Sequence, residues 1–224
     1  MKFIIIPARA GSKGLLNKNL QRVGGTSLVE WSIIHALYVA DDDDKVIVSS
    51  DSQKILESVA NTGVETVLRP ENLAQDTTPT LPVLEHALKY FKPADEDIII
   101  LLQPTSPLRK KTTLDKSLKA VVSGDGESSI TVKPNHFFLW EEIDGFIKPK
   151  YQDDIRRQDM KPQLSENGSI YVTKYCHFKE KGIKITNKIK PIITEGSENI
   201  DIDTKFDLDM ANYFSSEYVK EWQI

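Results

Sequence analysis

The chain lacks the features that hold a protein in a membrane or crosslink it outside the cell. None of its apolar runs approaches the roughly 20 residues that span a bilayer. The first residues read as a strand, so we expect no secretory signal. The single cysteine, Cys176, allows no internal disulfide and belongs to no Cys or His cluster with metal-ligand spacing. These absences predict a cytoplasmic protein that does not contact a membrane.

A dominant charge of one sign is also missing. The 224 residues include 29 Lys and Arg against 33 Asp and Glu, which gives a net charge of −4. Without a global basic field, nucleic acid is not an expected partner. With 39% hydrophobic and 28% charged residues, the composition is that of an ordinary globular protein. The length suits one domain with a sizeable insertion.

Short apolar runs alternate with helical patterns through the first 132 residues. The runs predict strands at residues 3–6, 46–48, 64–68, 98–102 and 129–132, and helices between them at 27–40, 52–61, 80–91 and 112–123. Further strands at 167–172 and 190–193 and a closing helix at 206–222 follow. This alternation predicts an α/β fold with a doubly wound, mainly parallel sheet. Ligands of such sheets bind beyond the carboxyl ends of the strands.

The first predicted helix has a clear start and an apolar stripe. Ser27 and Glu30 have the spacing of a capping box. The residues at helical spacing that form the expected buried face are Leu28, Trp31, Ile34 and Leu37.

The pattern changes between residues 134 and 164. Aromatic and apolar residues at 137–140 and 146–147 flank the turn pair Asp144-Gly145, which predicts a β-hairpin. A polar run follows at residues 152–161. We expect residues 134–164 to be an inserted segment that covers the site or pairs with another subunit.

A basic loop with glycines follows the first predicted strand. Its candidate residues are Arg9, Gly11, Ser12, Lys13, Gly14 and Lys18. Glycines let a backbone approach an anion, N–H groups point at it, and Arg and Lys supply charge. The loop matches neither G-x-x-x-x-G-K-S/T nor G-x-G-x-x-G. It therefore predicts a nucleotide or phosphate site of another kind, and solvated surface charges are the alternative.

Polar residues also follow the later strands. Residues 49–51, Arg69 and Gln103 come after the second, third and fourth strands. Asp201 and Asp203 precede the last helix, and alternation in an extended segment puts both carboxylates on one face. Two such carboxylates can share Mg²⁺, which takes its other ligands from water and substrate phosphates. A solvent-facing edge with a helix cap is the alternative interpretation.

Five motifs in this order resemble the acylneuraminate cytidylyltransferase family, also called CMP-sialic acid synthetases. They are IPARAGSK at residues 6–13 with KN at 18–19, RPENLAQD at 69–76, LQPTSP at 102–107, ENGSIY at 166–171 and DID at 201–203. The resemblance runs through nearly the whole chain. The run RRQDMKPQ at residues 156–163 is more similar to the branch that activates legionaminic acid.

The resemblance implies one nucleotidyltransferase domain over residues 1–224 and a reaction that joins CMP, from CTP, to a nine-carbon 2-keto sugar acid. The anomeric hydroxyl attacks the α-phosphorus and pyrophosphate leaves. By the same resemblance, Arg9, Gly11, Ser12 and Lys13 hold the triphosphate, Lys18 meets the α-phosphate, Asn19 and Arg69 contact cytosine, and Gln103 contacts a ribose or the sugar. Lys18, Asp201 and Arg9 are the implied catalytic residues. Asp201 and Asp203 bind one or two Mg²⁺ ions, and Asp201 or a metal-bound hydroxide takes the proton.

The sugar-acid end carries two further implied residues. Arg157 matches a position that meets the sugar carboxylate, and a guanidinium suits a carboxylate because it binds with two parallel hydrogen bonds. Tyr171 matches a residue of the sugar pocket. Lys133 is a further candidate charge. Lys184 and Ile185 stand where family members often carry aromatic residues. The resemblance also implies a homodimer that pairs through residues 134–164.

Other functions fit parts of the pattern. A cytidylyltransferase for the eight-carbon sugar Kdo is disfavoured, because its first loop usually carries Ser-Thr-Arg. A nucleotidyltransferase for a sugar phosphate or polyol phosphate needs additional basic residues, which Arg156 and Arg157 could supply. A nucleotide-binding module without turnover is the third alternative.

Overall fold

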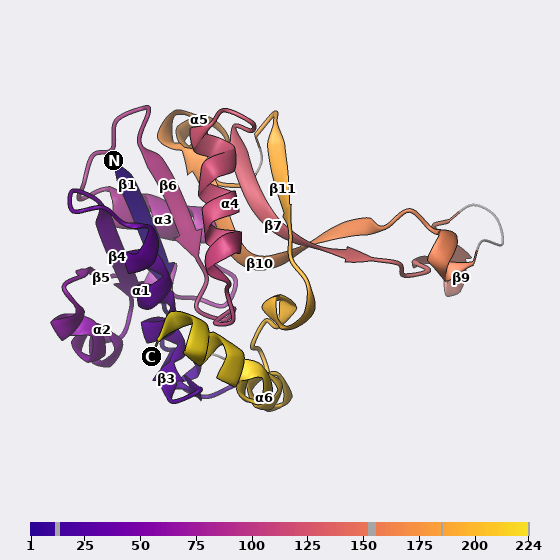
Figure 1. Cartoon of the computed structure of the whole chain (residues 1–224), viewed down its shortest axis with the longest axis horizontal. Coiled ribbons are helices and arrows are strands. Elements are labelled where there is room, and N and C mark those ends of the chain that lie inside the picture. Colours follow the sequence, from indigo (N-terminus) through magenta and orange to yellow (C-terminus); the bar gives the residue numbers. More distant parts are fainter. Residues whose placement is uncertain (12–13, 152–155, 185, 224) are drawn as a thin grey trace.

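A seven-stranded sheet forms the centre of the molecule, for which a computed structural model describes residues 1–11, 14–151, 156–184 and 186–223 (Figure 1). The strand order is β11-β7-β10-β6-β1-β4-β5. The strands are β1 (Lys2–Pro7), β4 (Lys45–Ser50), β5 (Glu65–Leu68), β6 (Ile98–Leu102), β7 (Ser128–Asn135), β10 (Gln163–Lys174) and β11 (Ile189–Ile193). β10 runs antiparallel to β6 and β7, and the other described pairs in this sheet are parallel.

Helices cover both faces of the sheet. They are α1 (Leu28–Val39), α2 (Gln53–Val59), α3 (Thr80–Leu88), α4 (Lys111–Val122), α5 (Tyr175–Lys181) and α6 (Lys205–Trp222). Ile4 and Ile6 of β1 belong to a core shared with α1, α2, α4 and α6, whereas Phe3 and Ile5 pack with α3 and α5. This alternation explains why β1 and β6 read as continuous apolar runs. The prediction of a doubly wound, mainly parallel sheet is confirmed.

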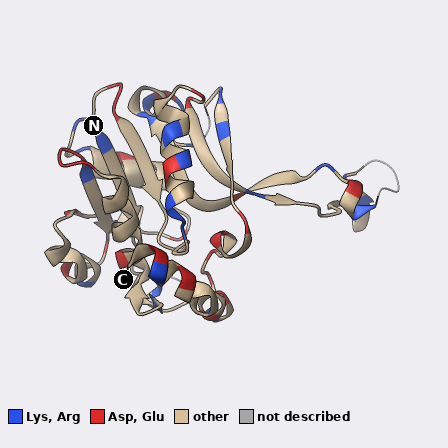
Figure 2. Ribbon diagram, viewed as in Figure 1, with Lys and Arg blue, Asp and Glu red and all other residues tan. Residues whose placement is uncertain are grey.

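Short elements complete the chain. They are the β2 (Arg22–Val23) and β3 (Thr26–Ser27) hairpin and the 3₁₀ turns η1 (Lys18–Leu20), η2 (Ala60–Thr62), η3 (Glu71–Leu73), η4 (Arg157–Asp159) and η5 (Gly196–Asn199). The sequence did not indicate β2, β3 or α5. Each is short, so each carries little periodic signal. Both signs of charge are spread along the helices (Figure 2). No helix in the described ranges is long and apolar enough to cross a membrane.

Helix α1 begins as predicted but buries a different face. Ser27 and Glu30 form the expected capping box. Leu37 is 48% exposed, however, while Ser32 and His35 are fully buried. The predicted stripe was wrong at Leu37. Helix α1 is enclosed on more than one side, because it packs on the sheet and α4, and His35 meets Trp222 of α6. Its buried surface is therefore not the single apolar stripe that the sequence spacing predicts.

An arm, residues 134–164, projects from the sheet (Figure 1). β7 and β10 remain paired with each other as far as Asn135 and Gln163, beyond the ends of the sheet's other strands. The expected hairpin forms as β8 (Trp140–Ile143) and β9 (Phe146–Pro149). Asp144 and Gly145 take positive φ angles of 52° and 80°, which a tight hairpin turn requires. Large apolar side chains of the arm are exposed, including Phe146 at 77% and Trp140 at 50%.

A buried polar cluster lies between α1, α6 and the loop after β6. The guanidinium of Arg109 contacts His35 Nδ1 at 3.0 Å, and the imidazole lies against the rings of Trp31 and Trp222. Burial, and then the charge of Arg109, holds the pKa of His35 well below its ordinary value of 6.5. His35 is therefore neutral at physiological pH and accepts the hydrogen bond from Arg109.

Acid should destabilise the protein through His35. Below pH 6.5 the unfolded chain takes up a proton at this residue and the folded protein does not, so the free energy of unfolding falls by up to about 1.4 kcal/mol per pH unit. In His35→Gln this contribution is lost. Urea unfolding at pH values from 8 to 5 should show that the difference in free energy of unfolding between wild type and variant narrows as the pH falls. A difference that stays constant would contradict a neutral buried His35.

Candidate functional site

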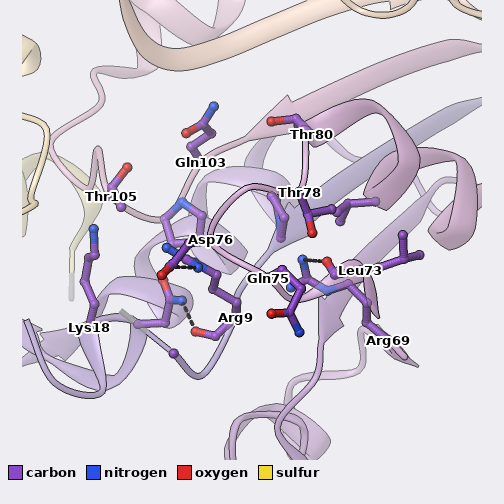
Figure 3. A pocket seen from close by; sticks show the side chains of 15 residues that line it. Arg9, Lys18, Arg69, Leu73, Gln75, Asp76, Thr78, Thr80, Gln103 and Thr105 are labelled. Carbon is purple, nitrogen blue, oxygen red and sulfur yellow. Dashed lines mark hydrogen bonds and ion pairs between the residues drawn. The ribbon is translucent and has the colours of Figure 1, made fainter. Parts of the chain in front are cut away.

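Two adjoining cavities open at the carboxyl edge of the sheet. The first, about 240 Å³, is lined by residues that follow β1, β5 and β6, among them Arg9, Lys18, Asn19, Arg69, Asp76, Thr80, Gln103 and Thr105 (Figure 3). The second, about 310 Å³, is lined by Gln103, Lys133, Glu166, Asn167, Gly168, Tyr171, Lys184, Asn199 and Asp201. Gln103 lines both, so a molecule in one cavity can reach a molecule in the other.

The two described cations of those predicted to bind phosphate are paired with carboxylates. Arg9 Nη1 lies 2.5 Å from Asp76 Oδ1, as the dashed line in Figure 3 marks. Lys18 Nζ lies 2.6 Å from Asp203 Oδ1, although 185 positions separate the two residues. In the free protein these two cations are thus neutralised by neighbouring carboxylates. A phosphate chain that binds Arg9 and Lys18 competes with these two carboxylates.

Arg69 and Asn19 are the buried polar residues of the first cavity. Arg69, 5% exposed, donates to the carbonyl of Ser49 at 3.2 Å. Burial lowers the pKa of Arg69 from 12.5, with Asp51 opposing this shift. Asn19 donates from Nδ2 to the carbonyl of Arg9 at 2.7 Å. Both side chains are fixed by backbone contacts and present preorganised polar groups to the cavity.

The two glycines of the first loop, Gly11 and Gly14, have different positions and different roles. A Cβ at Gly14 would lie 2.3 Å from the carbonyl oxygen of Asp203, so only glycine lets this loop pack against the segment before α6. Gly11 lines the first cavity. Ser12 and Lys13, also predicted to bind the nucleotide, lie outside the described residues.

Asp201 and Asp203 alternate with a buried residue. Ile202 is completely buried and donates its N–H to the carbonyl of Thr105 at 2.8 Å, so the neighbouring carboxylates point away from the core. Burial raises the pKa of Asp201; a hydrogen bond from Thr105 opposes the shift and the charge of Asp203 adds to it. Asp201 borders the second cavity, whereas Asp203 pairs with Lys18 of the first.

The carboxylates at this edge do not form a complete protein cage for a metal. Within the described ranges there is no group of three or more His, Cys, Asp or Glu side chains that could hold an ion. Two carboxylates suit Mg²⁺, because this ion usually keeps several waters and takes substrate phosphates as ligands. The donor set thus fits an ion that binds together with a nucleotide.

Tyr171 borders the second cavity and also belongs to the buried core that α3 and α5 share with the sheet. Its side chain is 1% exposed, and its hydroxyl donates to Glu166 at 2.9 Å. Glu166 also pairs with Lys184 at 2.8 Å. Glu166 belongs to the ENGSIY motif, but no sequence pattern indicated a role for it.

Asn167 and Asn199 were also missed. Asn167 donates to Thr194 at 2.9 Å and its carbonyl oxygen accepts from the N–H of Ser169; Thr194 donates to Asn199 at 2.7 Å. The network joins β10 to the segment that leads to Asp201. No local sequence pattern predicts this network, because its members come from separate elements.

Arg157 is separated from the other candidates. It lies in η4 on the arm, beside His136 and Gln158, and is absent from the lining of both cavities. Within one subunit the structure therefore does not bring Arg157 to the predicted sugar site.

Two adjoining cavities at the carboxyl edge of a doubly wound sheet, one of them lined by Arg9, Lys18 and Arg69, suit an enzyme that brings an anionic substrate and a second substrate together. Residues 3–184 match the family model for cytidylyltransferases. The chain belongs to the cytidylyltransferase family and is an enzyme of the nucleotidyltransferase class, as the motifs indicated.

Relatives extend over most of the chain. It is 33% identical to the CMP-N,N'-diacetyllegionaminic acid synthase of Legionella pneumophila, with 91% of each chain covered. It is 28% identical to the post-translational flagellin modification protein B of Campylobacter coli, over 95% of this chain and 94% of that protein. Identity to the N-acylneuraminate cytidylyltransferase of Escherichia coli is also 28%, over 92% of this chain but only 50% of the relative.

Solved structures share the fold. A CMP:2-keto-3-deoxy-manno-octonic acid synthetase complexed with CTP superposes with a TM-score of 0.69 at 16% identity, covering 97% of this chain and 99% of that one. The 4-diphosphocytidyl-2C-methyl-D-erythritol synthase of Anaerococcus prevotii gives 0.67 at 17% identity, covering 95% and 97%. These likenesses support the fold class.

Asp76→Asn should tighten CTP binding by about three- to tenfold at low salt. The change removes a carboxylate that competes for Arg9, and a partly exposed pair of this kind has an energy of this order. Calorimetric titration with CTP measures the effect. Asp95→Asn, which breaks the surface pair with Lys179 outside both cavities, is the matched control. Weaker binding by Asp76→Asn would instead mean that Asp76 holds Arg9 in position for the nucleotide.

Proposed function

We propose that the enzyme transfers CMP from CTP to the anomeric hydroxyl of a nine-carbon 2-keto sugar acid and releases pyrophosphate. Of the relatives, the Legionella protein named for diacetyllegionaminic acid matches at 33% identity over 91% of its length, which favours an acceptor of the legionaminate type over N-acetylneuraminate. The observation that carries the proposal is the pair of adjoining cavities that meet at Gln103.

CTP occupies the first cavity in this proposal. Arg9 and Lys18 bind the phosphates after release from Asp76 and Asp203, and charge-assisted contacts of this kind are strong and directional. Asn19 and Arg69, fixed by backbone hydrogen bonds, contact the cytosine. Asp201 and Asp203 would hold Mg²⁺, which would help to neutralise the charge of the triphosphate.

The acceptor occupies the second cavity, with its anomeric hydroxyl towards Gln103. Phosphoryl transfer needs positioning and charge stabilisation more than covalent catalysis. Asp201, which borders the second cavity, takes the proton of the attacking hydroxyl. Lys18 stabilises the charge that develops on the α-phosphate.

Asp201→Asn should lower kcat by at least about 100-fold, because it removes the general base and a metal ligand together. Pyrophosphate release with CTP and diacetyllegionaminate measures turnover, and circular dichroism checks the fold. Asp209→Asn, which removes the carboxylate paired with Lys205 on α6, is the control and should retain full activity. Near wild-type turnover by Asp201→Asn would remove Asp201 from the mechanism.

We further propose a homodimer that pairs through the arm, in a cytoplasmic enzyme, since CTP is a cytoplasmic metabolite. The arm exposes the large apolar side chains of Phe137, Trp140, Phe146 and Ile147, and exposed apolar side chains of this size favour an interface. Two-fold pairing is the commonest arrangement for a homo-oligomer. It also gives Arg157 a role: since it lies far from its own cavities, it meets the sugar carboxylate in the partner subunit.

Complementation between two defective variants tests this arrangement. Arg157→Ala should raise the acceptor KM much more than the CTP KM, because it removes a carboxylate contact. A purified heterodimer of Arg157→Ala and Asp201→Asn subunits should have one intact site and about half the wild-type activity at low acceptor concentration. Absence of recovery in a heterodimer of confirmed composition would place Arg157 outside the partner's site.

A further inference from the structure

Glu198 caps a helix that belongs to a distant part of the chain. It lies in η5, shortly before Asp201, and is 7% exposed. Its Oε1 accepts hydrogen bonds from the N–H of Lys110 at 3.2 Å and from the hydroxyl of Thr113 at 2.7 Å, at the start of α4. The ammonium of Lys110 lies 3.7 Å from the other carboxylate oxygen. A carboxylate is favourable here, because the first N–H groups of a helix have no partner within the helix and its dipole is positive at this end.

Helix α4 has no cap of its own. Its N-cap residue, Lys110, makes no side-chain hydrogen bond to the helix, and its first turn contains no acidic residue. A second glutamate from a distant element, Glu221 of α6, accepts from the N–H of Lys111 at 2.9 Å. A short polar side chain at the N-cap position itself is the usual way to stabilise a helix start. Capping alone therefore does not require a carboxylate from the segment that carries Asp201.

The loop before α4 and the segment before α6 are hydrogen-bonded to each other at two points. One point is the cap at Glu198, and the other is the hydrogen bond from the Ile202 N–H to the carbonyl of Thr105, which is 2.8 Å long. Gln103 and Asp201 stand close to the second point in the chain, and both line the second cavity. A segment that is held at two points cannot pivot about either one. The two contacts together therefore fix Asp201 relative to Gln103.

We propose that Glu198 is a positioning residue that holds Asp201 within reach of the attacking hydroxyl. The proposal rests on the proposed function for the role of Asp201. A general base works only within hydrogen-bond reach of the proton that it takes, and a displacement of about 1 Å can lower turnover about 100-fold. Glu198 is not among the described residues that line either cavity, so it acts through the backbone of this segment and not on a substrate.

The test compares Glu198→Ala with Glu221→Ala, which removes the other glutamate at the same helix end. Both substitutions remove a hydrogen bond at the start of α4, so each should lower the midpoint of thermal unfolding. Glu198→Gln is the conservative variant, because its carbonyl oxygen can accept the same two hydrogen bonds. Pyrophosphate release from CTP with diacetyllegionaminate measures turnover. Amide hydrogen exchange at Ile202 measures how firmly the segment is held to the loop.

Glu198→Ala should lower kcat about 10- to 100-fold and change the KM for CTP less than about twofold, because the defect lies in the placement of Asp201. Exchange at Ile202 should become about tenfold faster. Glu198→Gln and Glu221→Ala should keep the wild-type kcat and exchange rate. If Glu198→Ala does not fold, Thr113→Val replaces it, since this variant removes one of the two hydrogen bonds and keeps the side-chain shape. It should show the same changes to a smaller extent.

Unchanged turnover or unchanged exchange in Glu198→Ala would overturn the proposal. Equal losses in Glu221→Ala would also overturn it, because both glutamates would then act only as helix caps. A wild-type enzyme that binds CTP but releases no pyrophosphate with any nine-carbon acid would instead refute the proposed function. In that case the exchange rates at Ile202 still decide whether Glu198 holds the segment that carries Asp201.

Discussion

The guanidinium of Arg109 joins the end of β6 to the middle of β10, and both cavities depend on this junction. Arg109, 1% exposed, donates to the backbone carbonyls of Gln103 and Ser169 and contacts His35. Burial lowers its pKa from 12.5 to about 9, so it still carries its charge at neutral pH. A buried cation needs hydrogen-bond partners, and both terminal nitrogens of Arg109 have them, although its Nε has none in the described part of the chain. The two hydrogen bonds from Nη2 fix the backbone of Gln103, the residue that both cavities share.

Two ion pairs reduce the repulsion among the basic residues of the first cavity. Arg9 and Lys18 would repel each other and Arg69 if each stood unpaired around a cavity of about 240 Å³. Asp76 and Asp203 remove that repulsion at short distances. The same carboxylates repel an incoming triphosphate. Binding of CTP is therefore favoured when the negative charge of Asp203 is neutralised. The same principle operates in the second cavity, where Glu166 balances Lys184.

Much of the architecture could be predicted from the sequence, because apolar runs and turn residues report local structure directly. The strands β1, β4, β5 and β6 were found within a few residues, and so were the capping box of α1 and the hairpin turn at Asp144. The antiparallel direction of β10 could not be predicted, since strand direction follows from the path of the arm. The buried face of α1 was wrong at Leu37 because distant elements, α4 and α6, enclose the helix.

The sequence by itself determined the class of enzyme and which residues end up at the carboxyl edge of the sheet. Arg9, Asn19, Arg69 and Gln103 could be named because each follows a strand within a recognisable motif. The tertiary structure alone decided the pairings: Lys18 with Asp203, Glu166 with Lys184, and Arg157 on the arm away from its own cavities. Local patterns reflect short-range sterics and burial. Contacts between residues far apart in the chain depend on how the elements pack, and local sequence spacing does not predict that packing.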